Sequence, residues 1–309
     1  MKMKKLISGV TILAMSTLLL AACGGNNDKD TKDTKASTEE VVAESSTEAV
    51  ADEGEAKKLA GGDLQDGEFT LEEKNEKNDY RAVFTMVVKD GKIVESKYDN
   101  INKEGKSKTE DKEYNDMMKE KSGTNPETFI PALNEAFVAA QSADGVDTVS
   151  GATHSAESFK NYAQQLIQAS QAGNTDKIEI DNGAELKDGD YTLEEKNESN
   201  GYRTVFTIVV KDGKIAESKY DNVNAEGKSK TEDKDYNEMM KDKAGTSPET
   251  FIPELNKNLV DNQQPAEFDV VTGATHSSDS FKMYAEQLIN AAEKGDTTKI
   301  EVDNFVFEK

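Results

Sequence analysis

An internal repeat constrains the fold of this chain more than any other feature of its sequence. The segment 66–182 recurs as 188–304, and matching positions stay 122 residues apart without an insertion. About two thirds of the paired positions are identical, and a period of this length indicates a duplicated domain, because the units of a solenoid are only about 20–50 residues long. The sequence therefore predicts two tandem domains of the same fold.

The first half of each copy predicts an antiparallel sheet. In the first copy, residues 68–74, 80–89 and 92–101 have the composition of β-strands. Asp90 and Gly91 separate the last two segments and favour a tight hairpin turn, in which both central residues take a positive φ.

The second half of each copy predicts helices, so the expected fold class is α+β. In the first copy, residues 112–122 predict a helix that ends at Gly123, and Asn125 followed by Pro126 is a typical helix start. A third helix is predicted from near Ser155, because apolar side chains recur there at helical spacing. These side chains belong to Phe159, Tyr162, Ala163, Leu166 and Ile167.

The first residues have the form of a secretory signal peptide. Three of the first five residues are lysines, and an apolar stretch follows that ends on small residues. The sequence Leu-Ala-Ala-Cys at 20–23 resembles the lipobox of bacterial lipoproteins. This resemblance implies that residues 1–22 are removed and that lipid (palmitate) is attached to Cys23, which would hold the protein at the outer side of the cell membrane. The alternatives are a buried core helix and a short transmembrane anchor, although the stretch is marginal for crossing about 30 Å of hydrocarbon.

The residues between Cys23 and the first domain predict a spacer. Residues 23–65 contain no aromatic side chain and are rich in acidic, small and hydroxyl residues, so they bury too little apolar surface to offset the entropy of ordering. We therefore expect a disordered acidic tether, with a solvated helix at 39–51 as the alternative.

The composition excludes several classes of function. The formal net charge of −23 argues against a nucleic-acid partner, because binding to phosphates requires basic patches. With Cys23 as the single cysteine, an internal disulfide and an iron–sulfur cluster are excluded. With His154 and His276 as the two histidines, a multi-histidine metal site is not expected. Redox chemistry in this chain would need something other than thiols or a standard metal centre.

Both histidines lie in the most distinctive part of the repeat. Residues 147–155 read DTVSGATHS and residues 269–277 read DVVTGATHS, each directly before a predicted helix. We expect a strand-to-helix junction there, at which small residues let a bulky group approach and the N–H groups of the helix start suit a phosphate. The alternative is that Thr153 or Ser155 only caps the helix.

This Asp-x-x-Ser/Thr-Gly-Ala-Thr pattern resembles the flavinylation motif of the FMN-binding domain family, whose relatives include flavin subunits of sodium-pumping NADH:quinone oxidoreductase and Rnf complexes. In that family a Mg²⁺-dependent flavin transferase moves FMN from FAD onto the last threonine as a phosphoester. The resemblance implies two covalent FMN groups, on Thr153 and Thr275, and makes Asp147 and Asp269 the acidic positions that the transferase recognises. It implies further cofactor-binding positions around each acceptor: Ser150, Gly151, Ala152 and His154 in the first copy, and Thr272, Gly273, Ala274 and His276 in the second. For the histidines, a partly exposed residue at the helix start is the alternative to a flavin contact.

The whole chain resembles the flavinylated surface lipoproteins of Gram-positive extracellular electron transfer. That resemblance implies an electron-transfer protein rather than an enzyme with its own substrate. Its partners would be the flavin transferase, a membrane quinone/NADH dehydrogenase system as electron donor, and an extracellular acceptor such as ferric iron. The ring of the cofactor would do the chemistry, and the protein would position and tune it. Two non-redox alternatives are a surface lipoprotein that only binds a ligand and a precursor whose signal peptide yields a peptide pheromone.

Overall fold

The computed structural model describes residues 57–308. The expected signal peptide, Cys23 and the first part of the expected tether lie outside the described residues. Within 57–308, no helix combines the length and the apolar character that a membrane crossing requires.

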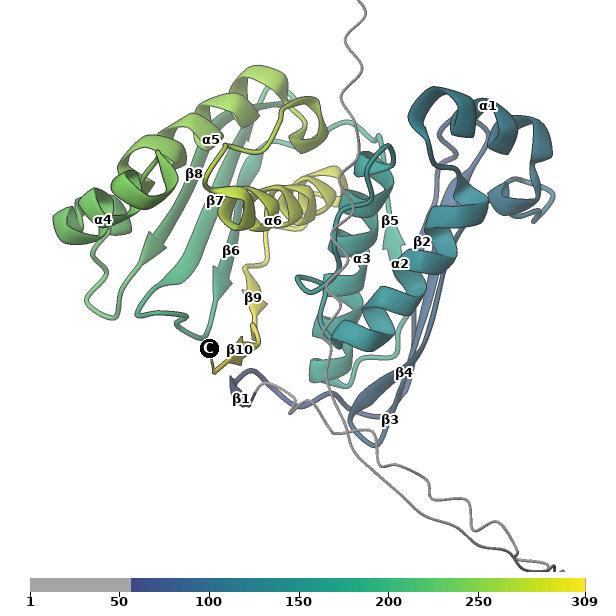
Figure 1. Cartoon of the computed structure of the whole chain (residues 1–309), viewed down its shortest axis with the longest axis horizontal. Coiled ribbons are helices and arrows are strands. Elements are labelled where there is room, and N and C mark those ends of the chain that lie inside the picture. Colours follow the sequence, from purple (N-terminus) through teal and green to yellow (C-terminus); the bar gives the residue numbers. More distant parts are fainter. Residues whose placement is uncertain (1–56, 309) are drawn as a thin grey trace, which may run out of the picture. The chain divides into compact units, whose positions relative to one another are not determined.

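Domain 1, residues 66–182, is a four-stranded sheet with helices α2 and α3 over one face (Figure 1). The strand order is β4-β3-β2-β5, in which β2, β3 and β4 pair antiparallel and the edge strand β5 pairs parallel to β2. The elements are β2 (Gly67–Glu73), β3 (Arg81–Lys89), β4 (Lys92–Ile101), the 3-10 helix η1 (Lys108–Glu110), α1 (Lys112–Ser122), α2 (Pro126–Ala140), α3 (Thr153–Ala172) and β5 (Ile178–Ile180).

Domain 2, residues 188–304, repeats this architecture with the strand order β8-β7-β6-β9 and with α5 and α6 over the sheet (Figure 1). It adds one short 3-10 helix, η3, before its last helix. The elements are β6 (Gly189–Glu195), β7 (Arg203–Lys211), β8 (Lys214–Val223), η2 (Lys230–Glu232), α4 (Lys234–Ala244), α5 (Pro248–Asn262), η3 (Pro265–Glu267), α6 (Thr275–Lys294) and β9 (Ile300–Val302). The expected α+β fold in two tandem copies is confirmed.

The hairpin between β3 and β4 has the predicted turn. Asp90 and Gly91 have φ values of 53° and 70°, and the Gly91 N–H donates to the Asp66 carboxylate at 2.9 Å. This bond ties the turn to the residue before β2, and the equivalent bond in domain 2 joins Gly213 to Asp188 at 3.0 Å.

The core of each domain lies between the sheet and its helices. Alternate side chains of β3 are buried, as a strand with one covered face requires. The predicted apolar stripe of the third helix is buried as well, and the Phe159 ring lies 4.9 Å from that of Phe84 in β3. The third helix therefore rests directly on the sheet, and the sheet fixes the position of its first residues.

A two-stranded sheet joins the two ends of the described chain. Strand β1 (Lys58–Ala60) pairs antiparallel with β10 (Val306–Phe307). The sequence places residues 58–60 in the disordered tether, so at these residues the structure differs from the expectation. The reason is that their partner lies at the far end of the sequence, where composition within the tether gives no sign of it.

The two domains contact each other through α3 and α6. Lys282 Nζ lies 2.9 Å from Glu157 Oε1, and the side chains are only 5% and 11% exposed. The repeat equivalents of these residues, Lys160 and Asp279, form the reciprocal pair at 3.8 Å. The helices thus meet as the subunits of a symmetric dimer do, residue i on j and j on i.

Candidate functional site

Each motif lies in the loop before the last helix of its domain. In domain 1 this loop follows α2 and contains no strand, so the expected strand-to-helix junction is wrong. Val146 is buried and Val149 packs partly buried against the core. The valines therefore face the core as loop residues, and their β-propensity does not produce a strand because no neighbouring strand pairs with them.

The motif forms a tight turn against the end of the first helix. The Ala152 N–H donates to the Val149 carbonyl at 2.9 Å, and Gly151 between them has a φ of +79°. A Cβ atom on Gly151 would lie 2.2 Å from the carbonyl oxygen of Ser122, the last residue of α1. Glycine is required here by both the backbone conformation and the close approach.

Domain 2 reproduces this turn. The Ala274 N–H donates to the Val271 carbonyl at 2.9 Å, Gly273 has a φ of +81°, and its Cβ would lie 2.2 Å from the carbonyl oxygen of Ala244 in α4. The two sites therefore share one backbone geometry.

The last threonine of each motif is the first residue of a helix. Helix α3 begins at Thr153, and its N-cap residue, Ala152, makes no side-chain hydrogen bond to the first turn. Helix α6 begins in the same way at Thr275 after Ala274. The alternative that Thr153 serves as the helix cap is therefore wrong, because Thr153 lies inside the helix and a cap lies outside it. The first-turn N–H groups stay available to another acceptor.

The motif residues differ in exposure, which distinguishes those that pack against the core from those that can contact a ligand or a partner protein. Ala152 and Ala274 are each only 4% exposed and fix the loop to the core. The other expected site residues are exposed: Asp147, Ser150, Gly151, Thr153 and His154 in domain 1, and Asp269, Thr272, Gly273, Thr275 and His276 in domain 2. The His154 side chain is 70% exposed, and its Nδ1 lies 3.9 Å from Glu157 Oε2. Each motif thus presents a hydroxyl, a carboxylate and an imidazole to a partner outside the domain core.

Hydrogen bonds to the sheet hold the helix that follows each motif. The Tyr162 hydroxyl donates to Glu73 Oε1 at 2.6 Å, and the Tyr284 hydroxyl donates to Glu195 Oε1 at 2.7 Å. Burial raises the pKa of Glu195, while the bonds from Thr204 and Tyr284 oppose that rise. The carboxylate at the end of β6 therefore connects α6 to the sheet.

These residues fit a phosphate ester. An uncapped helix start directs N–H groups and the positive end of the helix dipole at the position of the threonine oxygen. The glycine before it keeps the turn close to α1, which leaves the outer side of the loop free. The arrangement can hold a phosphate on the threonine without a metal ligand from the chain.

Sequence reasoning missed a difference between the two loops. In domain 2 the Val271 N–H donates to Ser278 Oγ at 3.0 Å, and this hydroxyl donates to the Ala274 carbonyl at 2.9 Å. Domain 1 has Ala156 at the equivalent position, so its loop lacks this link. Aligning the two copies of the repeat reveals the change, and the second turn is the more firmly held.

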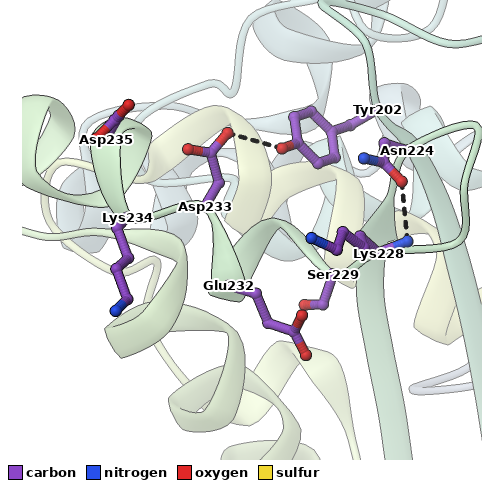
Figure 2. A pocket seen from close by; sticks show the side chains of 8 residues that line it. All are labelled: Tyr202, Asn224, Lys228, Ser229, Glu232, Asp233, Lys234 and Asp235. Carbon is purple, nitrogen blue, oxygen red and sulfur yellow. Dashed lines mark hydrogen bonds between the residues drawn. The ribbon is translucent and has the colours of Figure 1, made fainter.

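A polar pocket elsewhere in domain 2 is unrelated to the motif (Figure 2). Tyr202 donates to Asp233 across it at 2.8 Å, and the Asn224 side chain accepts from the Lys228 N–H at 2.8 Å. The pocket lies at the first turn of α4, whereas Gly273 contacts the last residue of that helix. Its polar groups are engaged with one another, and we assign it no role in cofactor binding.

Comparison with known proteins identifies relatives of each domain. The model of the FMN-binding domain matches residues 78–168 and 200–290, which together exceed half of the chain and include both motifs. The chain is 34% identical over 103 residues to the 15 kDa lipoprotein of Treponema pallidum (strain Nichols), covering 33% of this chain and 73% of that protein.

Two solved structures also match. The crystal structure of the CPE2226 protein from Clostridium perfringens is 35% identical, covers 38% of this chain and 97% of that chain, and has a TM-score of 0.37. A solution NMR structure from Clostridium thermocellum is 19% identical, covers 40% of this chain and 100% of that chain, and has a TM-score of 0.22.

Proposed function

The chain belongs to the FMN-binding domain family and contains two such domains, and we propose that it is a lipid-anchored electron carrier with two covalent FMN groups. The flavins are joined to Thr153 and Thr275 by phosphoester bonds. They carry electrons from a membrane quinone/NADH dehydrogenase system to acceptors outside the cell, such as ferric iron.

One observation carries this proposal. In both domains an exposed threonine is the first residue of a helix whose first-turn N–H groups have no side-chain cap. A threonine at such a place offers its hydroxyl for esterification and has donors at hand for the resulting phosphate. The same geometry in two copies supports two attachment sites.

The attachment step needs a flavin transferase with Mg²⁺ and FAD. The threonine Oγ forms a bond to the phosphorus of the FMN half of FAD, the phosphoanhydride bond breaks, AMP leaves, and the hydroxyl proton passes to water. The carboxylates of Asp147 and Asp269 are exposed and make no hydrogen bond or ion pair with other residues of 57–308, so they are free to contact the transferase.

Covalent attachment suits a carrier outside the cell. A dissociable cofactor would be diluted into the medium, whereas the ester keeps the flavin on the chain whatever its noncovalent affinity. When bound, FMN supplies the redox chemistry, and the chain supplies its position.

The anchor is part of the proposal. The lipobox at Cys23 supports a lipidated N-terminus, and the matched Treponema pallidum relative is a lipoprotein by name. Replacing Cys23 with Ala is expected to release the protein into the medium or to leave an uncleaved precursor, because the acyl chains hold it at the membrane. Fractionation with membranes as tightly as the parent protein would show that the anchor lies elsewhere.

Electron delivery is tested with flavinylated protein on membrane vesicles that are given NADH and a soluble ferric acceptor. The single variants Thr153→Ala and Thr275→Ala are expected to keep part of the ferric reduction, and the double variant to lose it. Thr148→Ala, an exposed threonine at a variable position of the same motif, is the matched control and should reduce iron at the parental rate. Parental activity in the double variant would refute the proposed role of the two threonines.

A further inference from the structure

We propose that the two acceptor threonines form one joint redox site, in which the two FMN groups exchange electrons within a single molecule. The inference rests on the proposed function for the identity of the bound groups. It rests on the contacts between α3 and α6 for their proximity.

The two helices run in the same direction. Three contacts follow one another along the pair, and each step moves four residues along both helices: Glu157 with Lys282 at 2.9 Å, Asn161 with Glu286 at 3.2 Å, and Gln165 with Asn290 at 3.3 Å. In an antiparallel pair, the residue numbers of successive contacts would fall along one helix while they rise along the other. The steady advance on both helices therefore requires a parallel pair.

The ends of the helices confirm this direction. Gln171 lies near the C-terminal end of α3, and its side chain donates to the Asp303 carbonyl at 2.8 Å. The equivalent residue in α6 is Glu293, whose carboxylate accepts from the Gly183 N–H at 2.7 Å. The last turns of both helices also line one cavity of about 350 Å³ between the domains. Both C-terminal ends thus lie together, and both N-terminal ends lie at the opposite end of the pair.

The N-terminal ends also interact across the domains. Lys160 in the second turn of α3 pairs with Asp279 in the second turn of α6 at 3.8 Å. The second turns of the two helices, each of which follows a motif, therefore lie side by side.

The direction of the pair sets the distance between the acceptors. Each helix has 20 residues, so it is about 30 Å long, and packed helices lie about 8–10 Å apart. A parallel pair places Thr153 and Thr275 on the order of 20 Å apart or less, whereas an antiparallel pair would place them about 30 Å apart.

The short distance between Thr153 and Thr275 gives the two domains a joint function. FMN groups held on Thr153 and Thr275 would lie close enough for an electron to pass from the reduced flavin to the oxidised one, with the accompanying proton exchanged with water. No second protein molecule and no mobile carrier is needed for this step. One domain can then face the membrane donor while the other delivers to the acceptor.

The distance is measured first without flavin. The chain from residue 24 onward contains the whole described part and no cysteine, so Thr153→Cys and Thr275→Cys carry two nitroxide labels for pulsed electron paramagnetic resonance. We expect a main distance of about 25 Å or less, labels included. The control pair, Thr153→Cys with Lys294→Cys, spans opposite ends of the helix pair and is expected at a clearly longer distance than the first pair, because most of the length of a helix separates its two positions. A main distance for the first pair that equals or exceeds the control would overturn the inference.

A charge reversal tests the contact itself. Glu157→Lys opposes Lys282 in a buried pair and is expected to lengthen and broaden the distance, while Glu120→Lys on the exposed face of α1 makes the same change of charge without effect. Unchanged distances in Glu157→Lys would contradict the role of this pair. The same Glu157→Lys and Glu120→Lys changes are also made in protein that keeps Thr153 and Thr275, where transferase labelling at both sites, read by mass, shows that each domain remains folded.

Electron exchange is then compared in two samples. In half-reduced protein with both flavins, the exchange rate should not depend on protein concentration. In a mixture of the Thr153→Ala and Thr275→Ala proteins, the rate should rise in proportion to concentration. Proportionality in the doubly loaded protein would refute intramolecular exchange but leave the flavin sites intact, whereas absence of flavin on the threonines would refute the proposed function without altering the measured distance.

Discussion

At the scale of single residues, the site depends on a glycine that touches another helix. Gly151 and Gly123 have the same φ of +79°, but only Gly151 has backbone within reach of a Cβ atom, at 2.2 Å. Alanine substitutions at the two glycines therefore distinguish the free-energy cost of a left-handed backbone, which both would have, from the cost of a steric clash, which only Gly151→Ala would have.

We expect Gly151→Ala to damage the site and Gly123→Ala to affect stability only. The control variant should lose about 1–2 kcal/mol of unfolding free energy, the cost of a left-handed alanine. Gly151→Ala should lose more, because the turn must move away from Ser122, and FMN incorporation at Thr153 should fall several-fold. Denaturant unfolding and the mass of the flavinylated product measure both effects. Equal incorporation in the two variants would contradict the importance of the close approach.

The acidic residue of each motif makes a different prediction. Asp147 is exposed and has no hydrogen-bond or ion-pair partner within the described chain, so Asp147→Ala should leave the melting temperature within the small range typical of surface substitutions. FMN incorporation at Thr153 should fall, while Thr275 in the same molecule keeps its flavin and serves as the internal control. A lower melting temperature with full incorporation would assign Asp147 a structural role instead.

At the scale of elements, the features that depend on local sequence were predicted correctly, whereas the strand pairings between distant residues were not predicted. The hairpin turn at Asp90 and the helix ending at Gly123 depend on neighbouring residues, and both are confirmed. The short strands β5 and β9 pair with strands more than a hundred residues earlier, and no pattern within three residues announces such a pairing. The helix after each motif starts two residues earlier than predicted, because the acceptor threonine joins the helix instead of preceding it.

A buried asparagine joins the elements that support the motif. Asn115 of α1 is 2% exposed, donates to the carbonyls of Lys108, Thr109 and Asp111, and accepts from the Glu127 N–H at the start of α2. It therefore fixes α1, whose last residue backs the motif turn.

Replacing Asn115 with Ala should destabilise domain 1 by about 1–3 kcal/mol, because the N–H of Glu127 loses its acceptor and the three carbonyls each lose a side-chain donor. Asp116→Ala, an exposed position on the same helix, should change stability by less than about 0.5 kcal/mol. Urea unfolding followed by circular dichroism measures both. A loss no greater than that of the control would show that water replaces the lost partner.

At the scale of the whole molecule, the contact between the domains is polar and was not predicted. Its members are charged or amide side chains, such as Glu157 and Lys282, that resemble ordinary surface residues in sequence. Only the repeat gives a hint, since both positions of each ion pair have charged equivalents in the other copy. The apolar periodicity of each helix places these side chains on its solvent-facing side, because that pattern reflects packing within one domain and not the contact with the other domain.

One member of this contact predicts a pH dependence. Burial, with repulsion from Glu157, raises the pKa of Glu286 from 4.5 to about 8. Below pH 4.5 the carboxyl is protonated in both the folded and the unfolded chain. Between pH 4.5 and 8 the unfolded chain releases the proton and the folded chain keeps it, so stability falls as the pH rises through this window.

We therefore expect Glu286→Gln to raise the melting temperature by a few degrees at pH 8 and by little at pH 4.5, because the amide carries no charge to bury. Glu120→Gln, on the exposed face of α1, is the control and should shift neither value. Parallel melting profiles for the parent and Glu286→Gln would show that the carboxyl is ionised at no cost in the folded protein.

The central claim, that Thr153 and Thr275 each carry FMN, is tested most directly by the intact mass of the chain from residue 24 onward after incubation with flavin transferase, Mg²⁺ and FAD. The account predicts a gain of two FMN-minus-water increments in the parent, one in Thr153→Ala or Thr275→Ala, and none in the double variant. Without the transferase the mass should not change. Two covalent flavins in the double variant, or none in the parent, would contradict it.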